Sequence, residues 1–562
     1  MRRLAAFAGA IWLLGTGVAS AHLTGAAPER DPFAVAAAAE FEGPVARAEC
    51  GPGSSPETAL QGQVPRGERE SGRSGRGYSC NLERIGWYQG EGASWVSQSY
   101  GHCAYVATRF PSEARSPGVQ VLDVSDPANP RRTATLTTPA MRGPWETLKV
   151  SPRRGLLAAV SASAPLGQGA AFFDVYDIGG DCAHPRLLNS VSESDLSAPA
   201  NSLGHEGGFS PDGMTYWSTF AYQGTITAID VANPAVPRIL YTGRTGTGNH
   251  GFGFSADGRR LYLAHAGRAD NILLTSNGLQ VFDVSEVQDR RPAPQIREVG
   301  RLFWEDGAIG QHAIPISYGG RPHVVFVDEM LAGAARIIDV SDEAAPRTIS
   351  KLRLEIQMPG REDIRRGDTT RPNSFGYDGH YCEADRAADP ALLACGYFAS
   401  GIRVFDVRDP RAPREIAYYN PPAQTGSRER LPGSEHAATD GDLTTDWCSS
   451  PPRFVGDQLW VTCQDNGFMV LRFTAAPPAP RPAVGSAPAL GLPSAARCVA
   501  RTFVFRLRRG LRSVRVYVNG RRVRVPRSRR VRVRVEGTAR VRVVARTRRG
   551  RRVRDERAYR AC

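Results

Sequence analysis

An alternating apolar strand that runs into an Asp- and Pro-rich turn recurs along this chain and limits the possible folds more than any other feature. The clearest copies are Gly118–Pro130, Gly278–Glu286, Ala335–Asp342 and Gly401–Pro410, with looser ones at 171–177 and 227–234. A supersecondary unit copied at intervals of about 50 residues is the signature of a repeat architecture. Four short strands can be traced in each full unit, and tandem four-stranded units are typical of a β-propeller.

The number of these strands predicts seven blades. Six copies carry an Asp, at Asp123, Asp174, Asp230, Asp283, Asp339 and Asp406. A seventh copy, Gly467–Phe473, has neither the Asp nor a strand after it. Segment 81–89 resembles a fourth strand that has lost its blade. We expect it to pair with Gly467–Phe473 and close the ring, because closure removes two open sheet edges.

The 562-residue chain is too long for one compact core, and its composition divides it into segments. Residues 1–21 have the layout of a secretory signal peptide. We expect an irregular segment at 22–79 with a short helix near Asp31–Glu40, then the propeller at 80–474, then an extended Pro- and Ala-rich linker at 475–497. No later apolar run approaches the ~20 residues of a membrane span. The sequence therefore predicts an exported protein, extracellular or held at the cell surface.

Residues 498–562 predict a separate basic module. They hold 24 Arg and three acidic residues, while the rest of the chain is net negative. Val and Arg alternate at 514–525, 531–535 and 539–544, and Asn519-Gly520 is a strong hairpin signal. Alternation with a period of two places Val on one face of a small antiparallel sheet and Arg on the other.

The basic face suggests a partner among anionic polymers of the cell envelope or other surface proteins. Nucleic acid is a poorer match, because no aromatic stacking platform accompanies the Arg. The alternative is a solvated face enriched in Arg by genome composition, since Lys149 and Lys351 are the only lysines. The sequence does not determine the oligomeric state.

Ten cysteines in an exported chain predict disulfides, and the absence of a Cys-x-x-Cys pair argues against a metal site. Two pairs flank the turn between neighbouring strands, Cys382 with Cys395 and Cys448 with Cys463. Cys498 and Cys562 stand at the two ends of the basic module and are expected to staple it. Three pairings stay open for the remaining four, Cys50, Cys80, Cys103 and Cys182.

A polar residue recurs in one register at the start of five first strands. The residues are Glu146, His205, His250, His312 and His380, and a Ser lies five positions after each of the first four. The first strand of every propeller blade lines the central channel, so we expect these side chains to share a ring near one mouth. The loops after second strands open on the same face and add Glu329, with His265 and Asp465 as further candidates.

Several roles are open for this ring. His205, His250, His312 and His380 suit one transition metal, copper or zinc. The ring can also bind a polar ligand or exchange protons with it. A structural role, in which each His ties neighbouring strands together, is the third hypothesis. For the Asp of the repeats we favour capping of the turn amides over calcium binding.

The segment Val121-Leu-Asp-Val-Ser-Asp-Pro127 and its copies resemble LVIVD repeats, which occur in exported bacterial and archaeal β-propellers. Cys50–Gly62 and Gly101–Tyr105 are similar to segments of actinobacterial members. The resemblance covers about residues 80–474 and implies a propeller and export, but no general activity. A fainter likeness, carried only by the four in-register histidines, is to the selenium-binding, methanethiol-oxidase propellers, in which channel histidines hold copper.

These features favour a binding or scaffold protein over an enzyme. The sequence contains no Gly-x-Ser-x-Gly elbow, phosphate-binding Gly loop or His-Glu-x-x-His helix. We expect an exported binding propeller whose basic module contacts anionic envelope polymers. The alternative is a metal-dependent oxidoreductase or hydrolase that uses the His/Glu ring.

Overall fold

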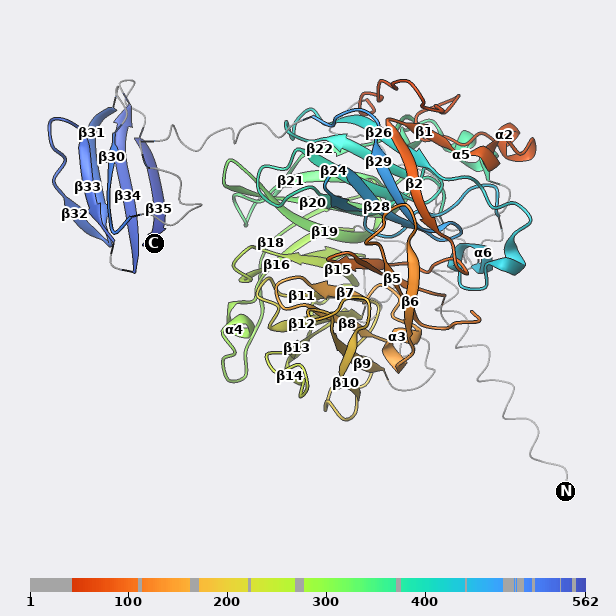
Figure 1. Cartoon of the computed structure of the whole chain (residues 1–562), viewed down its shortest axis with the longest axis horizontal. Helices are drawn as coiled ribbons and strands as arrows, with labels where there is room; N and C mark the ends of the chain where they lie inside the picture. Colours follow the sequence, from red (N-terminus) through yellow and green to blue (C-terminus); the bar gives the residue numbers. More distant parts are fainter. Residues whose placement is uncertain are drawn as a thin grey trace. The chain divides into compact units, whose positions relative to one another are not determined.

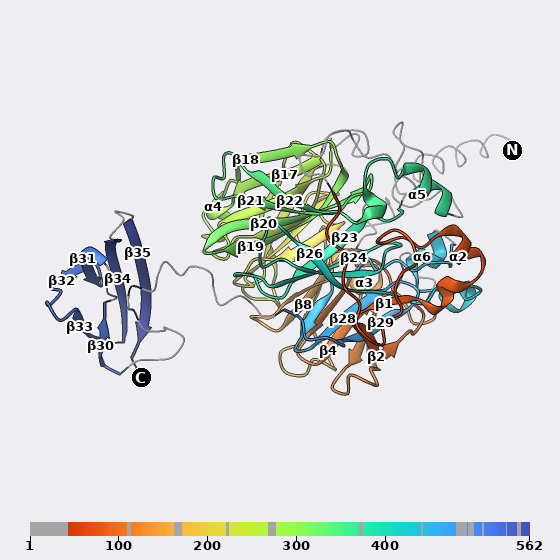
Figure 2. The ribbon, with the colours of Figure 1, turned by 90° about the horizontal axis from the view of Figure 1, so that it is seen from above.

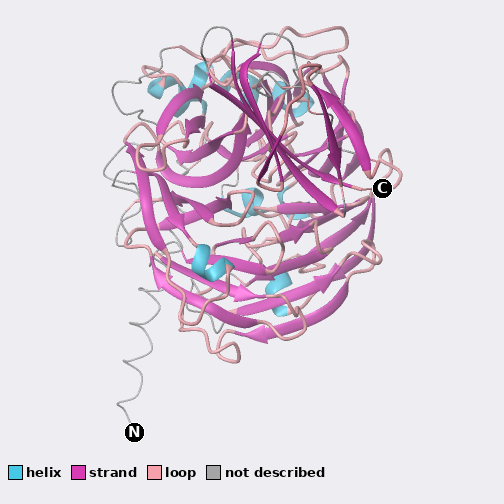
Figure 3. Cartoon of the chain, turned by 90° about the vertical axis from the view of Figure 1, so that its left-hand side faces the viewer, coloured by secondary structure: helices cyan, strands magenta, loops and turns pink. Residues whose placement is uncertain are grey.

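The structure is a computed structural model, and it divides the chain into two compact units, Met1–Pro480 and Arg481–Cys562, which are described separately. Both consist mainly of β-strands (Figure 1, Figure 3). The residues it describes are 43–109, 114–161, 171–220, 224–267, 277–369, 375–439, 442–478, 490, 492, 500–507, 511–535, 537–547 and 552–561. The expected signal peptide, the helix near Asp31–Glu40 and both Cys498 and Cys562 lie outside them.

The described part of the first unit forms seven antiparallel sheets. Figure 2 shows several of them from above. Five consist of four strands in chain order: β3 (Ser97–Tyr100), β4 (Cys103–Ala107), β5 (Val119–Asp123), β6 (Arg131–Leu136); β7 (Lys149–Ser151), β8 (Leu156–Val160), β9 (Phe172–Asp177), β10 (Arg186–Ser192); β11 (Glu206–Phe209), β12 (Thr215–Phe220), β13 (Thr225–Asp230), β14 (Arg238–Arg244); β15 (Asn249–Phe254), β16 (Arg260–His265), β17 (Asn277–Asp283), β18 (Arg297–Trp304); and β19 (Ala308–Tyr318), β20 (Arg321–Met330), β21 (Ala335–Asp339), β22 (Arg347–Leu352). The predicted all-β propeller fold is confirmed.

The last two sheets contain strands from both ends of the unit. One adds β1 (Tyr78–Cys80) to β23 (Gly379–Ala384), β24 (Leu392–Tyr397), β25 (Ile402–Asp406) and β26 (Arg414–Asn420); the other adds β2 (Leu82–Tyr88) to β27 (Arg453–Val455), β28 (Gln458–Cys463) and β29 (Gly467–Phe473). The pairing of β2 with β29 runs from Leu82 opposite Phe473 to Tyr88 opposite Phe468, as predicted for the orphan strand.

Short helices lie in the connections. Among the described residues they are α2 (Arg66–Glu70), α3 (Pro139–Arg142), α4 (Ser285–Gln288), α5 (Glu362–Asp368) and α6 (Glu435–Thr439), with 3-10 turns at η1 (Arg73–Arg76), η4 (Glu355–Gln357) and η5 (Arg428–Arg430). No helix in this part of the chain is long and apolar enough to cross a membrane.

An Asp at the end of six of the seven third strands accepts a hydrogen bond from a backbone N–H of the following turn, which is the predicted capping role. The Asp123 carboxylate accepts a hydrogen bond from the Ser125 backbone N–H at 2.9 Å and pairs with Arg131 directly across the sheet at 3.0 Å. These contacts lower the pKa of Asp123 to about 2. The same cross-strand pair recurs in five other sheets, as Asp177–Arg186, Asp230–Arg238, Asp283–Arg297, Asp339–Arg347 and Asp406–Arg414.

One assignment in that series was wrong. Asp177, and not Asp174, occupies the turn position of β9, because the strand continues three residues further before it pairs with Arg186. The buried carboxylate of Asp174 instead accepts hydrogen bonds from the backbone N–H groups of Ala140 and Met141, at 2.8 and 3.3 Å, at the start of α3.

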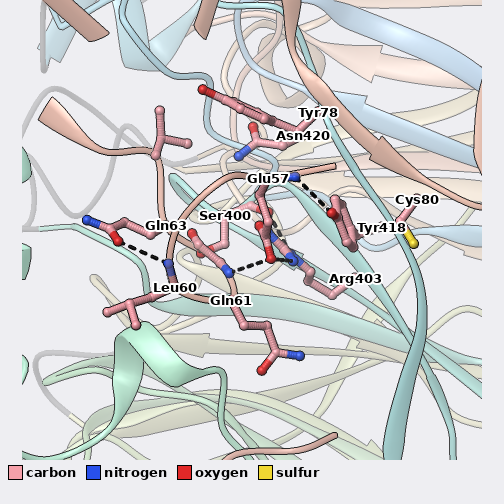
Figure 4. A network of polar contacts seen from close by, with 12 residues as sticks. Glu57, Leu60, Gln61, Gln63, Tyr78, Cys80, Ser400, Arg403, Tyr418 and Asn420 are labelled. Atoms are coloured by element: carbon pink, nitrogen blue, oxygen red, sulfur yellow. Dashed lines mark hydrogen bonds and ion pairs between the residues drawn. The ribbon is translucent and has the colours of Figure 1, made fainter. Parts of the chain in front are cut away.

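The described residues before β1, 43–77, are ordered against the sheet of β23–β26 and contain α2 and η1. The guanidinium of Arg403, which is completely buried, pairs with Glu57 at 2.8 Å (Figure 4). It also pairs with Glu415 at 3.0 Å. Gln61 donates a hydrogen bond to Glu415 at 2.9 Å, and the Ser400 hydroxyl donates to the Gly62 carbonyl at 2.8 Å. These contacts hold the segment against β25 and β26.

Disulfides hold the first unit together at four places. Cys382–Cys395 and Cys448–Cys463 form as predicted, the first across the paired strands β23 and β24, the second between the loop before β27 and the end of β28. The open pairing resolves as Cys50–Cys80, which fastens the N-terminal segment to β1, and Cys103–Cys182, which joins two neighbouring sheets. The predicted Cys498–Cys562 bond lies outside the described residues.

The second unit packs a two-stranded sheet against a four-stranded one. The strands are β30 (Thr502–Arg506) and β33 (Arg530–Arg534), and β32 (Arg521–Val523), β31 (Leu511–Val518), β34 (Thr538–Thr547) and β35 (Arg552–Arg560). Val531, Val533, Val541 and Val543 are buried in its core, whereas Arg532 and Arg540 are exposed. The predicted division into a Val face and an Arg face is therefore present.

Replacing Glu57 tests the buried contact of the N-terminal segment. We expect Glu57→Ala to lower the free energy of unfolding by about 3 kcal/mol, because it leaves a buried guanidinium with one carboxylate partner. Glu83→Ala is the matched control, since Glu83 and its partner Arg472 are 46% and 48% exposed and such a pair contributes about 0–1 kcal/mol. Urea unfolding measures both. Equal losses in the two variants would contradict the buried-pair account.

Candidate functional site: a buried ring of His and Glu

The starts of the first strands meet at the centre of the sheets and bring four of the predicted side chains together. Glu146 precedes β7 and forms a β-bridge with Glu206, His205 precedes β11, His250 lies in β15 and His380 in β23. All four side chains are buried. Propeller geometry and a shared register thus place residues from four separate sheets around one point.

The carboxylate of Glu146 is the centre of this ring. Its Oε1 lies 2.9 Å from His380 Nε2, and its Oε2 lies 3.4 Å from His250 Nε2 and 3.6 Å from His205 Nε2. The Nε2 atoms of His205 and His250 are 2.7 Å apart. Glu329, predicted from a loop after a second strand, approaches His380 Nε2 at 3.5 Å.

Backbone carbonyl groups orient two of the imidazoles. The Nδ1 atom of His250 lies 3.1 Å from the carbonyl of Gln311, and that of His380 lies 2.7 Å from the carbonyl of Ser449. A carbonyl only accepts hydrogen bonds, so Nδ1 carries the proton in both rings and Nε2 is directed at Glu146. This is the arrangement by which proteins orient imidazole ligands.

His312 is not part of the ring, contrary to its predicted register. Gln311 occupies the position, and its side-chain Nε2 donates a hydrogen bond to Glu146 Oε1 at 3.0 Å. The pairing of β19 with β20 shifts between Gly310 and His312, just as β15 shifts after Asn249 and β23 after Gly379. Gln311 is therefore the equivalent of His250 and His380.

The misleading signal was Ser317. In β15 the Ser lies at the turn that ends the strand, but β19 continues to Tyr318 and Ser317 pairs with Pro322 inside the ladder. A slip of one residue along a strand moves each side chain to the neighbouring position, so counting back from Ser317 selects His312 in place of Gln311.

His312 belongs to a second polar layer, one residue further along the first strands. Its Nδ1 lies 3.9 Å from Glu206 Oε1, and its ring centroid lies 5.0 Å from that of Tyr381. The Tyr381 hydroxyl donates a hydrogen bond to Glu206, and Lys149 Nζ lies 2.5 Å from Glu206 Oε1. Burial raises the pKa of Glu206 to about 7 against the opposing effect of Lys149, and burial lowers the pKa of His312 well below its usual value.

Sequence analysis missed Lys149, Glu206, Gln311 and Tyr381. The sequence contained a signal for Lys149, because it is one of only two lysines in a chain with 69 arginines. The other lysine, Lys351, is also paired with a buried carboxylate, that of Asp306. Lysine therefore occurs here only where a compact ammonium meets a buried acid.

The second layer borders a pocket of about 370 Å³. Lys149, His312 and Tyr381 line it, together with Phe209, Phe252 and other residues at the ends of first strands. A neighbouring pocket of about 310 Å³ shares Gln98 and Glu383 with it. The ring residues Glu146, His205, His250 and His380 do not line either pocket, so the second layer separates them from it.

Aromatic side chains surround His380 and the adjoining part of the ring. The Trp95 ring lies 5.5 Å from His380 and 5.4 Å from Trp145, and Phe398 lies 5.2 Å from His380. Phe375 and Trp447 pack in the same cluster. Trp145 and His205 have φ values of +50° and +70°, a conformation that side chains other than glycine rarely adopt. Backbone strain of this kind often occurs at functional sites.

The buried carboxylates of Glu146 and Glu329 require a positive charge close to them. Burial disfavours the charged form of His380, but its contacts with Glu146 and Glu329 prevail and raise its pKa to about 10. Among the described residues, Oε2 of Glu146 and Oε2 of Glu329 have no hydrogen-bond partner. Buried carboxylate oxygens are costly without a donor or a cation, so protons or a metal ion must balance them.

The other two sequence candidates lie elsewhere. His265 stacks on Phe303 with ring centroids 4.4 Å apart. Asp465 accepts a hydrogen bond from His436 at 2.8 Å, while Asp446 accepts from the backbone N–H groups of Asp465 and Asn466. The carboxylate oxygens of Asp446 and Asp465 thus accept hydrogen bonds from neighbouring groups, and these contacts hold a turn.

Comparison with known proteins assigns the chain to no family. No protein-family model and no curated protein matches the sequence. Similar solved structures include a putative 6-phosphogluconolactonase from Bacteroides fragilis, with 11% identity, a TM-score of 0.44 and coverage of 65% of this chain and 88% of that one. Another from Bacteroides uniformis has 12% identity, a TM-score of 0.45 and coverage of 66% and 91%.

The periplasmic gluconolactonase PpgL of Pseudomonas aeruginosa has 14% identity, a TM-score of 0.42 and coverage of 67% of this chain and 97% of that one. These likenesses are coarse, and no argument here rests on them. The resemblance to LVIVD-repeat proteins, which no family model supports, stays a prediction.

The turn cluster of Asp446 predicts a pH effect on stability. Burial and the charge of Asp465 raise the pKa of Asp446 to about 7, above the 3.8 of an unperturbed Asp. Between these values the folded protein holds a proton that the unfolded chain releases, so wild-type stability should fall as pH rises from about 4 to about 7. In Asp446→Asn this loss, worth a few kcal/mol, should be absent. Urea unfolding at pH 4.5 and pH 7.5 measures it, and a difference between the two proteins that is independent of pH would contradict the assignment.

Proposed function

We propose that this chain is an exported binding propeller that holds one transition-metal ion at the ring of Glu146, His205, His250 and His380. The observation that carries the proposal is the convergence of three imidazole Nε2 atoms on a carboxylate whose Oε2 has no hydrogen bond among the described residues. Three nitrogens and a carboxylate oxygen from four sheets are a suitable donor set for copper or zinc.

The three Nε2 atoms and the carboxylate oxygen would fit a tetrahedral metal ion after a small movement of the side chains. Around a tetrahedral ion with bonds of 2.0–2.1 Å, two nitrogen ligands lie about 3.3 Å apart. The Nε2 atoms of His205 and His250, at 2.7 Å, would separate by a few tenths of an ångström. His380 would give up its Nε2 proton, so metal and protons compete and metal affinity should fall as pH is lowered.

The surroundings of the ring favour a structural role for the metal. The second layer covers its pocket side, and aromatic side chains pack around His380. Structural metal sites are closed, whereas catalytic ones keep an open position. A metal here would tie four sheets together at the centre and leave the pocket and loops free to bind a partner. Four disulfides, which persist in oxidising compartments, support export.

A metal-dependent enzyme is the second candidate, and the pocket next to Glu206 favours it. Lys149, Tyr381 and His312 offer proton-transfer groups on the wall of a cavity large enough for a small molecule. This candidate requires turnover by the metal-loaded protein that Lys149→Gln abolishes at unchanged metal content.

Metal analysis of protein from the exported fraction tests the main proposal. We expect about one copper or zinc ion per chain in the wild type and almost none in His250→Ala, which removes one of four ligands. His184→Ala is the matched control, because His184 is exposed and its imidazole pairs with the exposed carboxylate of Asp181 at 2.9 Å, away from the ring. A chelator should lower the melting temperature of the wild type and of His184→Ala but not that of His250→Ala. Metal-free wild type that neither copper nor zinc stabilises would overturn the proposal.

A further inference from the structure

The wide sheet of the second unit presents an arginine surface. On β31, β32 and β34 the side chains that alternate with buried Val point outward, and those of Arg are exposed or half-buried. We call this set the wide Arg face: Arg512, Arg515, Arg522, Arg540, Arg542 and Arg546. The two-stranded sheet has a smaller set on its own outer side, Arg506, Arg530, Arg532 and Arg534.

Like charges lie directly opposite each other on these sheets. Arg512 pairs in register with Arg546 across β31 and β34, and Arg506 pairs with Arg530 across β30 and β33. Like charges in cross-strand pairs lower the stability of a sheet. Such an arrangement therefore costs stability in the isolated protein.

The first unit is an internal control for genome composition. There, each of the six fourth strands that begin with Arg places it opposite a carboxylate partner, such as Asp123 for Arg131 and Asp230 for Arg238. Among the residues whose side chains the structure describes, no ion pair involves Arg512, Arg515, Arg522, Arg540 or Arg546. A preference for Arg over Lys affects both units alike, so it does not explain why these five arginines lack an acidic partner among those residues, while Arg542 lies opposite Glu556 of β35.

We infer that the wide Arg face binds a linear phosphodiester polymer of the cell envelope, recognised through its charge. Successive outward residues on one strand are about 7 Å apart, and neighbouring strands about 4.8 Å, which gives a grid of guanidinium groups. Guanidinium groups bind phosphate oxygens in a bidentate manner. This inference concerns the second unit alone and does not depend on the metal site.

The face lacks what a nucleic-acid reader needs. Its one aromatic side chain among the described residues is Tyr517, and the guanidinium of Arg542 covers that ring at 4.6 Å from the centroid. Bases bound without sequence preference usually stack on free aromatic rings. A polymer without bases does not need free aromatic rings, so their absence does not weaken its binding.

Binding of full-length protein to poly(glycerol phosphate) tests the inference, with two matched triple variants. Arg512→Gln/Arg540→Gln/Arg546→Gln alters the wide Arg face, and Arg506→Gln/Arg530→Gln/Arg532→Gln removes the same charge from the other side. We expect the first variant to weaken binding at least tenfold at 50 mM NaCl. We expect it to reduce the slope of log K against log salt by about 2, since each lost contact contributes about 0.7. The second variant should show a smaller effect on both quantities.

A further readout reports on the fold itself. Without polymer, the first variant should melt at the same or a higher temperature than wild type, because it relieves the repulsion between Arg512 and Arg546. Equal binding by wild type and the first variant, or a larger loss in the second variant, would overturn the assignment to the wide Arg face. Tighter binding of double-stranded DNA, by tenfold or more at equal phosphate concentration, would identify nucleic acid as the partner and overturn the envelope polymer.

Discussion

The pairing of β2 with β29 is the contact on which the rest of the first unit depends. It joins the beginning and the end of the repeat region in one sheet, and the neighbouring sheet gains β1 from the same N-terminal segment. Closure gives every first strand a place at the centre, where side chains from sheets far apart in sequence can meet. The Cys50–Cys80 disulfide and the buried contact of Glu57 with Arg403 hold the N-terminal strands in that position.

The closed centre buries several carboxylates, and two layers of residues balance their negative charge. Glu146 and Glu329 are buried near three imidazoles, and Glu206 is buried one residue further along the strands against Lys149 and Tyr381. Each carboxylate is stable there only with a proton or a cation close by. The first layer obtains its positive charge from His380 or from a metal ion, and the second obtains it from Lys149. At the ends of the third strands, the repeated Asp–Arg pairs balance the charge of the Asp carboxylates in the same way, and water solvates the charges there as well.

Repetition made much of this predictable, and breaks in the repetition account for the errors. The Asp of five third strands and the closing strand followed from patterns that recur. Asp174 was mistaken for Asp177 because β9 runs past its first Asp, and His312 was mistaken for Gln311 because β19 runs past Ser317. Strand ends and bulges depend on pairing partners, which a single sequence does not display. Glu206 and Tyr381 belong to a layer that has a different residue in every sheet, so no register revealed them.

The most direct test of the account is an anomalous scattering measurement on crystals of protein purified from the exported fraction, at the absorption edges of copper and zinc. The account predicts one peak at the centre of the ring, about 2.0–2.2 Å from the Nε2 atoms of His205, His250 and His380 and from an oxygen of Glu146. No peak at either edge, with the Nε2 atoms of His205 and His250 still in direct contact after soaking in each metal, would show that protons alone balance the ring and would contradict the central claim.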